Sequence, residues 1–257
     1  NYTPDVDERN NVVGFFSSMD DITKIKEAEN AMRSAKQAAE DSMLAKSQFL
    51  ASMSHEIRTP MNGVFGMLSI LKRGELSETQ ERQVSIAQKS ANSLLNIIND
   101  ILDFSKIDAD KLELENIDFN LQEMIDTFAK FMTVLAEEKE LELIVDTTEL
   151  REVMVKGDPV RIQQILQNLI GNAIKFTKTG EVIVKILLKK STDTEFLLHG
   201  QITDTGIGIP EDKLSTLFDS FTQADASTTR QYGGTGLGLA ISKKLVALMG
   251  GGICWIR

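Results

Sequence analysis

The sequence predicts a multidomain α and α/β protein, in which a long helical hairpin precedes an α/β sandwich domain. Two observations lead to this prediction. Apolar residues recur at helical spacing through residues 25 to 102, whereas helix-like and strand-like stretches alternate after Asn116. The chain of 257 residues is long enough for such a division and for a hydrophobic core.

The composition excludes several classes of protein. Acidic residues outnumber basic ones by 38 to 28, so nothing indicates a nucleic-acid-binding surface. The single cysteine, Cys254, excludes an intramolecular disulfide and suits a reducing compartment. The first residues show no signal-peptide pattern, and no apolar run approaches the ~18 residues that a membrane span needs. We therefore expect a cytoplasmic segment of a longer protein that makes no membrane contact itself, although an upstream segment could anchor it.

The first 21 residues contain one predicted strand. Val12 to Met19 is β-branched and aromatic, and Asp20 or Asp21 can cap the helix that follows. A strand that ends in Met-Asp-Asp-Ile-Thr before a long helix resembles the exit of a PAS sensor domain. A short tail strand explains the pattern almost as well.

Residues 22–45 predict a linker helix with a weak heptad pattern. The a and d positions carry mostly small or flexible residues, and one of them is a lysine. The heptad pattern continues beyond residue 45, and its a and d positions are Ile25, Ala28, Met32, Ala35, Ala39, Ser42, Lys46, Phe49 and Met53. The linker is either a weak coiled coil whose packing can shift or a plain solvated helix.

The helix that continues to about Arg73 carries a histidine on its polar side. Its apolar face is formed by Phe49, Met53, Ile57, Val64, Leu68 and Leu71. His55 lies about 200° around the helix from Met53, among polar neighbours. Glu56 follows it and could accept a ring proton, Thr59 stands one turn further along, and Pro60 should kink or loosen the helix.

A second helix follows a break at Gly74-Glu75, and Ser77 and Gln80 form an approximate capping box at its start. Its apolar stripe is wider than one partner helix requires. The stripe consists of Val84, Ala87, Ala91, Leu94, Leu95, Ile98, Ile101 and Leu102. Two helices cannot close a core by themselves, whereas two copies can, so we predict a homodimer built on a four-helix bundle.

The rest of the chain predicts an α/β domain with helices on one side of a mixed sheet. The expected helices are Phe119–Lys139, Asp158–Phe176 and Leu237–Met249. The expected strands are Leu141–Asp146, Val153–Lys156, Val182–Leu188 and Glu195–Thr203.

Three pieces of this domain could form one polar site. Gln164, Asn168 and Asn172 recur every four residues on the helix Asp158–Phe176, with Lys175 beyond them, and such a stripe suits metal, water or phosphate. The loop Asp204-Thr-Gly-Ile-Gly follows a strand, and its carboxylate could accept the amino group of a base. The glycine-rich run from Gly233 opens the last helix, whose N-terminus favours phosphate.

These motifs resemble those of a known family in the usual order. Ser-His-Glu-Ile-Arg-Thr-Pro-Met-Asn-Gly resembles the H-box of sensor histidine kinases, and the stretch from Asp100 resembles the exit of their second helix. The three polar pieces resemble the N, G1 and G2 boxes of the ATPase superfamily that these kinases share with gyrase, and Phe218 and Phe221 resemble the F-box. The resemblance places dimerisation and phosphotransfer in residues 46–115 and ATP binding in residues 116–257.

The resemblance implies a role for individual residues. His55 would be phosphorylated by ATP, with Glu56 as proton acceptor and Thr59 active toward a phosphorylated response-regulator receiver domain. Asn168 and Asn172 would hold Mg²⁺, Lys175 and Arg230 would contact phosphate, and Asp204 would read adenine. The full predicted ATP-binding set is Asn168, Asn172, Lys175, Phe176, Asp204, Gly206, Gly208, Arg230, Gly234, Thr235, Gly236, Leu237 and Gly238.

Three alternatives remain open from the sequence. A Gly-x-Gly run before a helix could indicate a dinucleotide fold, but no strand directly precedes Gly233. The α/β domain could bind nucleotide only as a switch on a coiled-coil scaffold, which would need neither His55 nor Glu56. A free ATPase of the gyrase type would carry glutamate where this chain has Asn168. The end of the chain also departs from the family, with three glycines from Gly250 and none of the usual following strands.

Overall fold

The computed structural model describes residues 2–17, 21–109, 111–150, 153–192, 195–220 and 236–255. Contacts divide the chain into two compact units, residues 1–49 and 50–257, and the boundary falls inside the first helix. Within the described residues, no helix is long and apolar enough to cross a membrane.

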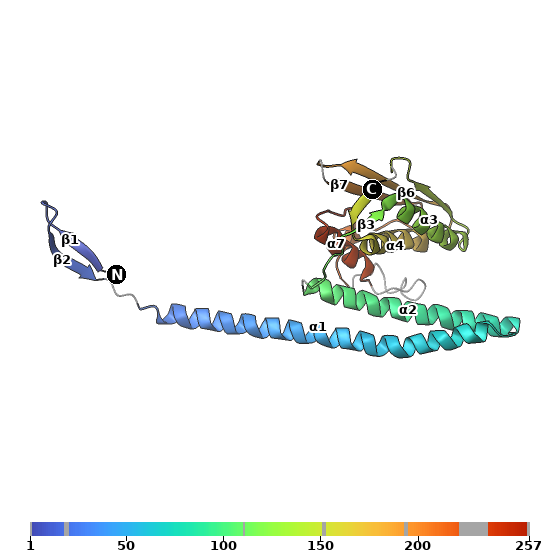
Figure 1. Cartoon of the computed structure of the whole chain (residues 1–257), viewed down its shortest axis with the longest axis horizontal. Helices are drawn as coiled ribbons and strands as arrows, with labels where there is room; N and C mark the ends of the chain where they lie inside the picture. Colours follow the sequence, from blue (N-terminus) through green and yellow to red (C-terminus); the bar gives the residue numbers. More distant parts are fainter. Residues whose placement is uncertain are drawn as a thin grey trace. The chain divides into compact units, whose positions relative to one another are not determined.

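The N-terminal unit begins with a β-hairpin rather than the single strand expected from the sequence. β1 (Tyr2–Val6) pairs antiparallel with β2 (Val12–Ser17), as Figure 1 shows. Asp7 organises the turn, because its carboxylate accepts the backbone N–H groups of Arg9 and Asn11, both at 2.9 Å. The prediction missed β1 because Tyr2–Val6 contains a proline and an aspartate, which are unfavourable in strands.

The two long helices form where the sequence predicts them. α1 (Thr23–Lys72) continues through Pro60, and the Asp21 carboxylate accepts the Thr23 N–H at 2.9 Å. α2 (Glu78–Asp108) begins with the predicted capping box: Ser77 Oγ accepts the Gln80 N–H at 3.4 Å, and Gln80 Oε1 accepts the Ser77 N–H at 2.9 Å. The short turn between the helices makes residues 50–108 an antiparallel hairpin.

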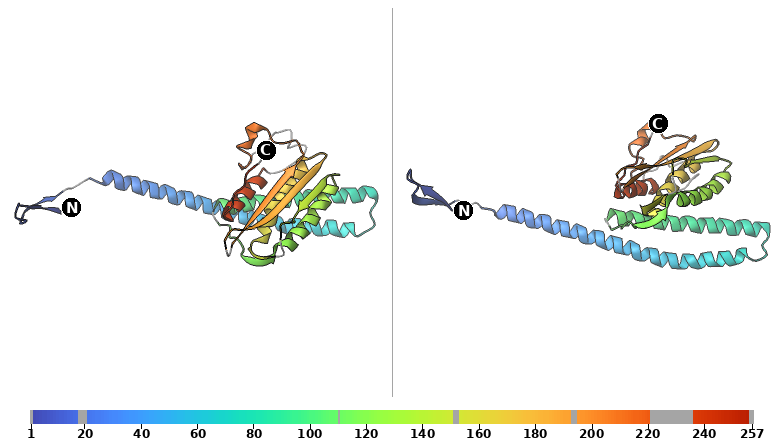
Figure 2. Two further views of the ribbon diagram at one scale, coloured as in Figure 1. Left: turned by 90° about the horizontal axis from the view of Figure 1, so that it is seen from above. Right: turned by 45° about the horizontal axis from the view of Figure 1, so that its top comes forward.

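The α/β domain contains two small sheets rather than the one mixed sheet that we expected. β4 (Glu142–Asp146), β6 (Glu181–Lys190) and β7 (Phe196–Asp204) form a mixed three-stranded sheet, in which β4 is parallel and β7 antiparallel to β6. β3 (Ile117–Asn120) and β5 (Met154–Gly157) form a separate antiparallel pair. The helices nevertheless lie on one side of the larger sheet, as predicted (Figure 2).

The predicted helix Phe119–Lys139 starts too early. Residues 117–120 are strand β3, in which Phe119 pairs with Val155, and α3 runs from Leu121 to Glu137. Asn120 sets this boundary because its side chain accepts the Glu123 N–H at 3.1 Å as an N-cap. Within the described residues, the other helices are α4 (Pro159–Phe176), the short and unpredicted α5 (Glu211–Leu214) and α7 (Gly238–Leu248).

The main core lies between the larger sheet and helices α3 and α4. Solvent is almost completely excluded from its centre, where the exposed fraction is 0% for Ile125, Val182 and Val184 and 2% for Ile170. A second cluster joins α2 to α7: Ile107 packs with Leu237, Ile241 and Leu245. The core therefore fixes α4 by its apolar face and leaves its polar face toward α2 and α7.

Candidate functional site

The N-terminus of α4 is fixed by one buried carboxylate. Asp158 is 3% exposed, and its Oδ1 accepts the Arg161 N–H at 3.0 Å as the N-cap of the helix. Its Oδ2 accepts the Glu115 N–H at 3.0 Å, which ties the segment between α2 and β3 to the same point. Asp158 thus positions the helix that carries the predicted polar stripe.

Asn168 joins α4 to the start of α7. Its Nδ2 donates to the Gly238 carbonyl at 3.1 Å and to Ser242 Oγ at 3.2 Å. A Cβ atom at Gly238 would lie 3.4 Å from the Asn168 amide, so glycine permits this close approach. Because both bonds use the amide nitrogen, the oxygen Oδ1 is the atom of Asn168 suited to a cation.

The loop after β7 is held against the C-terminal end of α4. The Ile207 N–H donates to the Phe176 carbonyl at 3.4 Å, and the Gly206 N–H donates to Asp204 Oδ1 at 2.9 Å. A Cβ atom at Gly206 would approach the Phe176 carbonyl oxygen to 2.7 Å, so a side chain there would displace the loop. Asp204 itself is exposed, and the loop places it beside the last turn of α4.

Thr205 ties the same loop to the start of β6. Its Oγ1 accepts the Glu181 N–H at 3.0 Å, and its own N–H donates to the Glu181 carbonyl at 3.2 Å. Gly208 has a φ of +68°, which L-residues with a side chain rarely adopt. The loop that is predicted to bind adenine is therefore held by hydrogen bonds to both α4 and β6.

Two lysines meet at the C-terminal end of α4. Lys139 Nζ donates to the carbonyls of Ile174 and Lys175 at 3.0 and 3.2 Å, and Lys175 Nζ lies 4.9 Å from the centre of the Phe176 ring. Partial burial, followed by the charge of Lys139, lowers the pKa of Lys175 from its ordinary value. A positive charge held in this environment favours an anion, because a nearby negative group would offset both effects.

The last glycine-rich piece is only partly described. Gly236 has a φ of +70°, and Gly238 is the first residue of α7. The Leu237 side chain is 1% exposed and packs in the cluster with Ile107, so it faces the core and not the predicted site. Arg230, Gly234 and Thr235, together with Phe221, lie outside the described residues.

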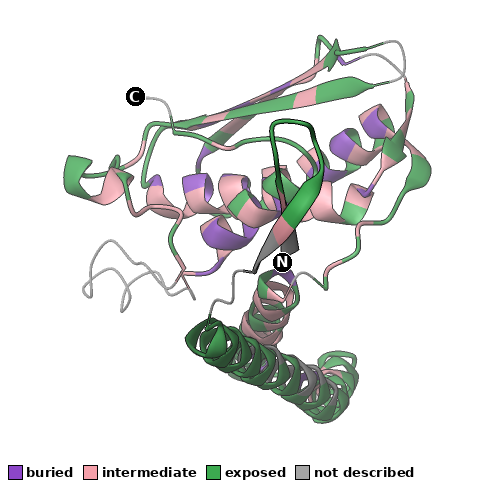
Figure 3. Ribbon diagram, turned by 90° about the vertical axis from the view of Figure 1, so that its left-hand side faces the viewer, coloured by how far each residue is buried: buried purple, intermediate pink, exposed green. Residues whose placement is uncertain are grey.

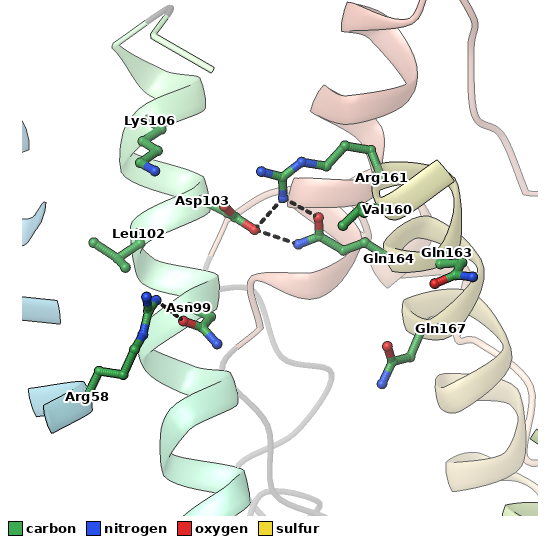
Figure 4. Close-up of a pocket in the computed structure, with 10 residues that line it drawn as sticks. All are labelled: Arg58, Asn99, Leu102, Asp103, Lys106, Val160, Arg161, Gln163, Gln164 and Gln167. Atoms are coloured by element: carbon green, nitrogen blue, oxygen red, sulfur yellow. Dashed lines mark hydrogen bonds and ion pairs between the residues drawn. The ribbon is translucent and has the colours of Figure 1, made fainter. Parts of the chain in front are cut away.

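The predicted polar stripe on α4 does not act as one unit. Gln164 is turned toward α2, where its Nε2 donates to Asp103 Oδ2 at 2.7 Å (Figure 4). Arg161 donates to the same carboxylate oxygen at 2.9 Å and to Gln164 Oε1 at 2.7 Å. Of the residues in the predicted stripe, Gln164 therefore belongs to the contact with α2, while Asn168, Asn172 and Lys175 keep their place in the predicted site.

Four further residues of these contacts are not predicted by any sequence motif: Asp103, Lys139, Arg161 and Ser242. Each bonds to a partner at least 35 residues away in the chain, so local spacing gives no signal for it. The stretch from Asp100 resembles a helix exit and gives no other sign of this contact. A charged pair such as Asp103 and Arg161 could have been found only from a correct model of how α4 meets α2.

The helical segment around His55 is described by its backbone and some side chains. His55 lies within α1, but its side chain is outside the described set; Glu56 and Thr59 are exposed. Among the described residues, no group of three or more His, Cys, Asp or Glu side chains is arranged to hold a metal. A divalent cation in the α/β domain would therefore depend on amide oxygens and on its ligand.

Comparison with known families gives two matches. Residues 45–110 match the His Kinase A (phospho-acceptor) domain, and residues 157–257 match the histidine kinase-, DNA gyrase B- and HSP90-like ATPase. These ranges contain His55 and the three polar pieces of the α/β domain, respectively.

Curated relatives and a solved structure agree with these matches. The signal transduction histidine-protein kinase BarA of Escherichia coli K12 is 48% identical over 219 residues, which are 85% of this chain and 24% of BarA. The autoinducer 2 sensor kinase/phosphatase LuxQ of Vibrio cholerae is 41% identical over 240 residues, 93% of this chain and 28% of LuxQ. Full-length ShkA in complex with AMPPNP is 34% identical with a TM-score of 0.60, covering 79% of this chain and 41% of ShkA. The chain spans about a quarter of the length of the curated relatives that it matches.

Proposed function

The chain belongs to the sensor histidine kinases, whose phosphoacceptor and ATPase domains it carries, and we propose that it is an ATP-dependent protein-histidine kinase that phosphorylates His55. One observation supports this most directly. The bonds of Asn168 to Gly238 and of Phe176 to Ile207 gather three distant pieces of sequence around one face of α4. That face combines amide oxygens, a lysine and an exposed carboxylate, which are groups suited to binding a nucleoside triphosphate.

In this proposal, different residues of the α/β domain bind different parts of the nucleotide. Asp204 accepts a hydrogen bond from the amino group of adenine. Lys175 and Arg230 contact phosphate, and the first N–H groups of α7 face phosphate oxygens. Asn168 and Asn172 fit Mg²⁺ because the Asn168 oxygen is left as an acceptor while its nitrogen is bonded to α7. When bound, Mg²⁺ would neutralise charge on the phosphates.

Transfer then requires a nucleophile and a proton acceptor on α1. Neutral His55 attacks the γ-phosphoryl group in line, the new N–P bond replaces the bond to the β-phosphate oxygen, and ADP leaves. Glu56 takes the proton from the other ring nitrogen. Asn168 cannot act as a general base for water, because an amide does not accept a proton near neutral pH. Hydrolysis of ATP should therefore be slow.

The phosphoramidate on His55 is labile enough to pass to an aspartate of a receiver domain. We infer a response-regulator receiver as the partner, on this chain's longer parent or on a separate protein, in two-component signalling. We also infer a homodimer, since large apolar side chains of the hairpin remain exposed in one chain: Val64, Met67, Ile86, Leu94 and Ile101. A kinase of this type would act in the cytoplasm, where ATP is available.

The test of the kinase activity is labelling with γ-labelled ATP, followed by checks for acid-labile and base-stable label. His55→Gln should abolish labelling and retain binding of a fluorescent ATP analogue, because the two sites are on different domains. Asn172→Ala should lose Mg²⁺-dependent binding, and Asp204→Asn should weaken adenine recognition. Persistent label in His55→Gln, or unchanged binding in both of the other variants, would refute the assignment.

Phosphatase activity toward the receiver is proposed for Thr59, and the name of LuxQ, a sensor kinase/phosphatase, is consistent with it. Thr59 stands one turn after His55, and its hydroxyl could orient water toward a phospho-aspartate docked there. A purely conformational role before Pro60 is the alternative. Thr59→Val keeps the shape, so unchanged receiver dephosphorylation would favour that alternative, whereas slower dephosphorylation with normal His55 labelling supports the proposal.

A further inference from the structure

The ATP-binding domain is attached to the hairpin of its own chain by three polar side chains, which we call the interdomain clamp: Asp103 on α2, and Arg161 and Gln164 on α4. Asp103 Oδ2 accepts from Arg161 Nη1 at 2.9 Å and from Gln164 Nε2 at 2.7 Å, and Arg161 also donates to Gln164 at 2.7 Å. The side chains of Arg161 and Asp103 are only 20% and 16% exposed. A charge-assisted cluster this sheltered is a stronger contact than an open surface ion pair.

A second contact holds α7 to the same helix. Lys244 Nζ bonds to Asp108 Oδ1 at 2.7 Å and lies 4.6 Å from the centre of the Phe104 ring. Beside it, the apolar cluster of Ile107 and Leu237 joins the last turn of α2 to the first turn of α7. Both helices that carry the proposed nucleotide site are therefore attached to the α2 of their own chain.

The clamp borders a pocket that reaches the H-box. The pocket has a volume of about 350 Å³, and Arg58 of α1 lines it together with residues of α2 and with Gln163, Gln164 and Gln167 of α4 (Figure 4). Arg58 Nη2 donates to Asn99 Oδ1 at 3.2 Å. His55 is one turn before Arg58, and Asp103 is one turn after Asn99 on an antiparallel helix. The clamp and the H-box therefore stand at nearly the same level of the hairpin.

The clamp lies on the side of the hairpin away from its exposed apolar stripe. On α2, Asp103 is about 200° around the helix from Ile101, which is 37% exposed and belongs to the stripe. On α1, position 55 is likewise about 200° from Ile57. A second chain that covers the stripe would thus stand on the far side of α2 from α4.

We propose that phosphoryl transfer takes place within one chain: the nucleotide of the α/β domain phosphorylates His55 of the same chain, and Asp103 acts as a positioning residue through Arg161 and Gln164. This inference rests on the proposed kinase function and specifies its substrate histidine. The bond between the β-phosphate oxygen and the γ-phosphorus breaks, a bond to a ring nitrogen of His55 forms, and the ring proton passes to Glu56. The second copy contributes to the bundle and not to the reacting pair.

Heterodimers with two different affinity tags test this proposal. One heterodimer pairs His55→Gln with Asn172→Ala, so that only transfer between chains can label it. The other pairs the wild-type chain with the double variant His55→Gln/Asn172→Ala, so that only transfer within a chain can label it. We expect label in the second heterodimer, at about half the wild-type homodimer level, and none in the first.

The outcomes are distinguishable from failure of the kinase proposal itself. Label in the first heterodimer, or none in the second while the wild-type homodimer is labelled, overturns transfer within one chain. An unlabelled wild-type homodimer instead refutes the proposed kinase function.

Charge exchange tests the clamp. Asp103→Arg and Arg161→Asp should each slow His55 labelling by about tenfold with little change in affinity for an ATP analogue, because the nucleotide site itself is intact. The double variant restores the opposite charges and should recover part of the lost rate. If each single variant labels at the wild-type rate, or if the double variant is no better than the worse single one, Asp103 has no positioning role.

Discussion

The hairpin and the α/β domain bury their apolar residues very differently. α2 has 31 residues, and only Val84, Ala91 and Ile107 are buried, whereas the 17 residues of α3 include five that are buried. Figure 3 shows the contrast by colour: buried residues gather on the helices and strands of the α/β domain, while α1 is largely exposed. The first region lacks a core in one chain, and the second has a complete one.

This difference separates two sources of stability. The α/β domain is stabilised by side chains of the same chain, so its unfolding should not depend on protein concentration. The hairpin has to bury its stripe against another surface, and in the proposed dimer this makes its stability depend on concentration. The clamp of Asp103, Arg161 and Gln164 connects a region with its own core to one whose apolar stripe is exposed in a single chain.

The largest expected effect is in the core of the α/β domain. Phe128 and Phe131 lie one turn apart on α3, with exposures of 9% and 55%. Phe128→Ala should lower the free energy of unfolding by about 3–5 kcal/mol, and Phe131→Ala by less than about 1 kcal/mol. Urea unfolding followed by the fluorescence of Trp255, the chain's one tryptophan, would measure both. Similar losses in the two variants would contradict the burial difference.

A smaller, concentration-dependent effect is expected in the hairpin. Leu94 on α2 is 44% exposed in one chain. Leu94→Asp places two carboxylates in the proposed bundle and should weaken the dimer by about 3 kcal/mol, roughly a hundredfold in Kd. Sedimentation would measure it, with Phe131→Asp as the control at an exposed position of the α/β domain, where Phe131 is 55% exposed. A monomeric wild-type chain, or a variant dimer of unchanged Kd, would refute the hairpin interface.

Much of this contrast could be predicted from the sequence. Helical spacing gave both hairpin helices, and the Ser77 capping box marks a local boundary that depends on neighbouring residues alone. β1 and β3 were missed because strands are stabilised by pairing with distant residues: Phe119 is extended since it pairs with Val155. Local propensity could not reveal that pairing, nor the separation of β3 and β5 from the larger sheet.

The site divides in the same way. Asn168 lies on a helix and Asp204 at the end of a strand, as the motifs predict, because these local features depend on helical spacing and on glycines with tight surroundings. Gln164 has the right spacing for the polar stripe but bonds to Asp103, and Leu237 lies within a glycine motif but packs into the core. Spacing determines which face of a helix a residue occupies, and tertiary contacts determine what meets that face.

The smallest expected effect concerns Lys175, where function and stability should respond in opposite directions. Lys175→Met removes a charge that burial and Lys139 disfavour, so at neutral pH the variant should be as stable as the wild type or slightly more stable. In the proposed site it also removes a phosphate contact, so affinity for an ATP analogue should fall by about tenfold or more. The control is Lys178→Met, which removes an exposed lysine three residues further along the chain and should change neither stability nor affinity.

The contribution of Lys175 to stability depends on pH, in a direction set by its lowered pKa. Because the pKa of Lys175 is lowered in the folded state, the unfolded chain holds more protons between that lowered pKa and the ordinary value of 10.5. The contribution of Lys175 to stability therefore rises with pH across this window, and the variant should lack that rise. Urea unfolding of both proteins over this range would show it as a stability difference that favours the variant at the lower pH and shrinks as the pH increases. A difference that grows with pH in favour of the variant would mean that the folded state stabilises the charge of Lys175, contrary to its half-buried position beside Lys139.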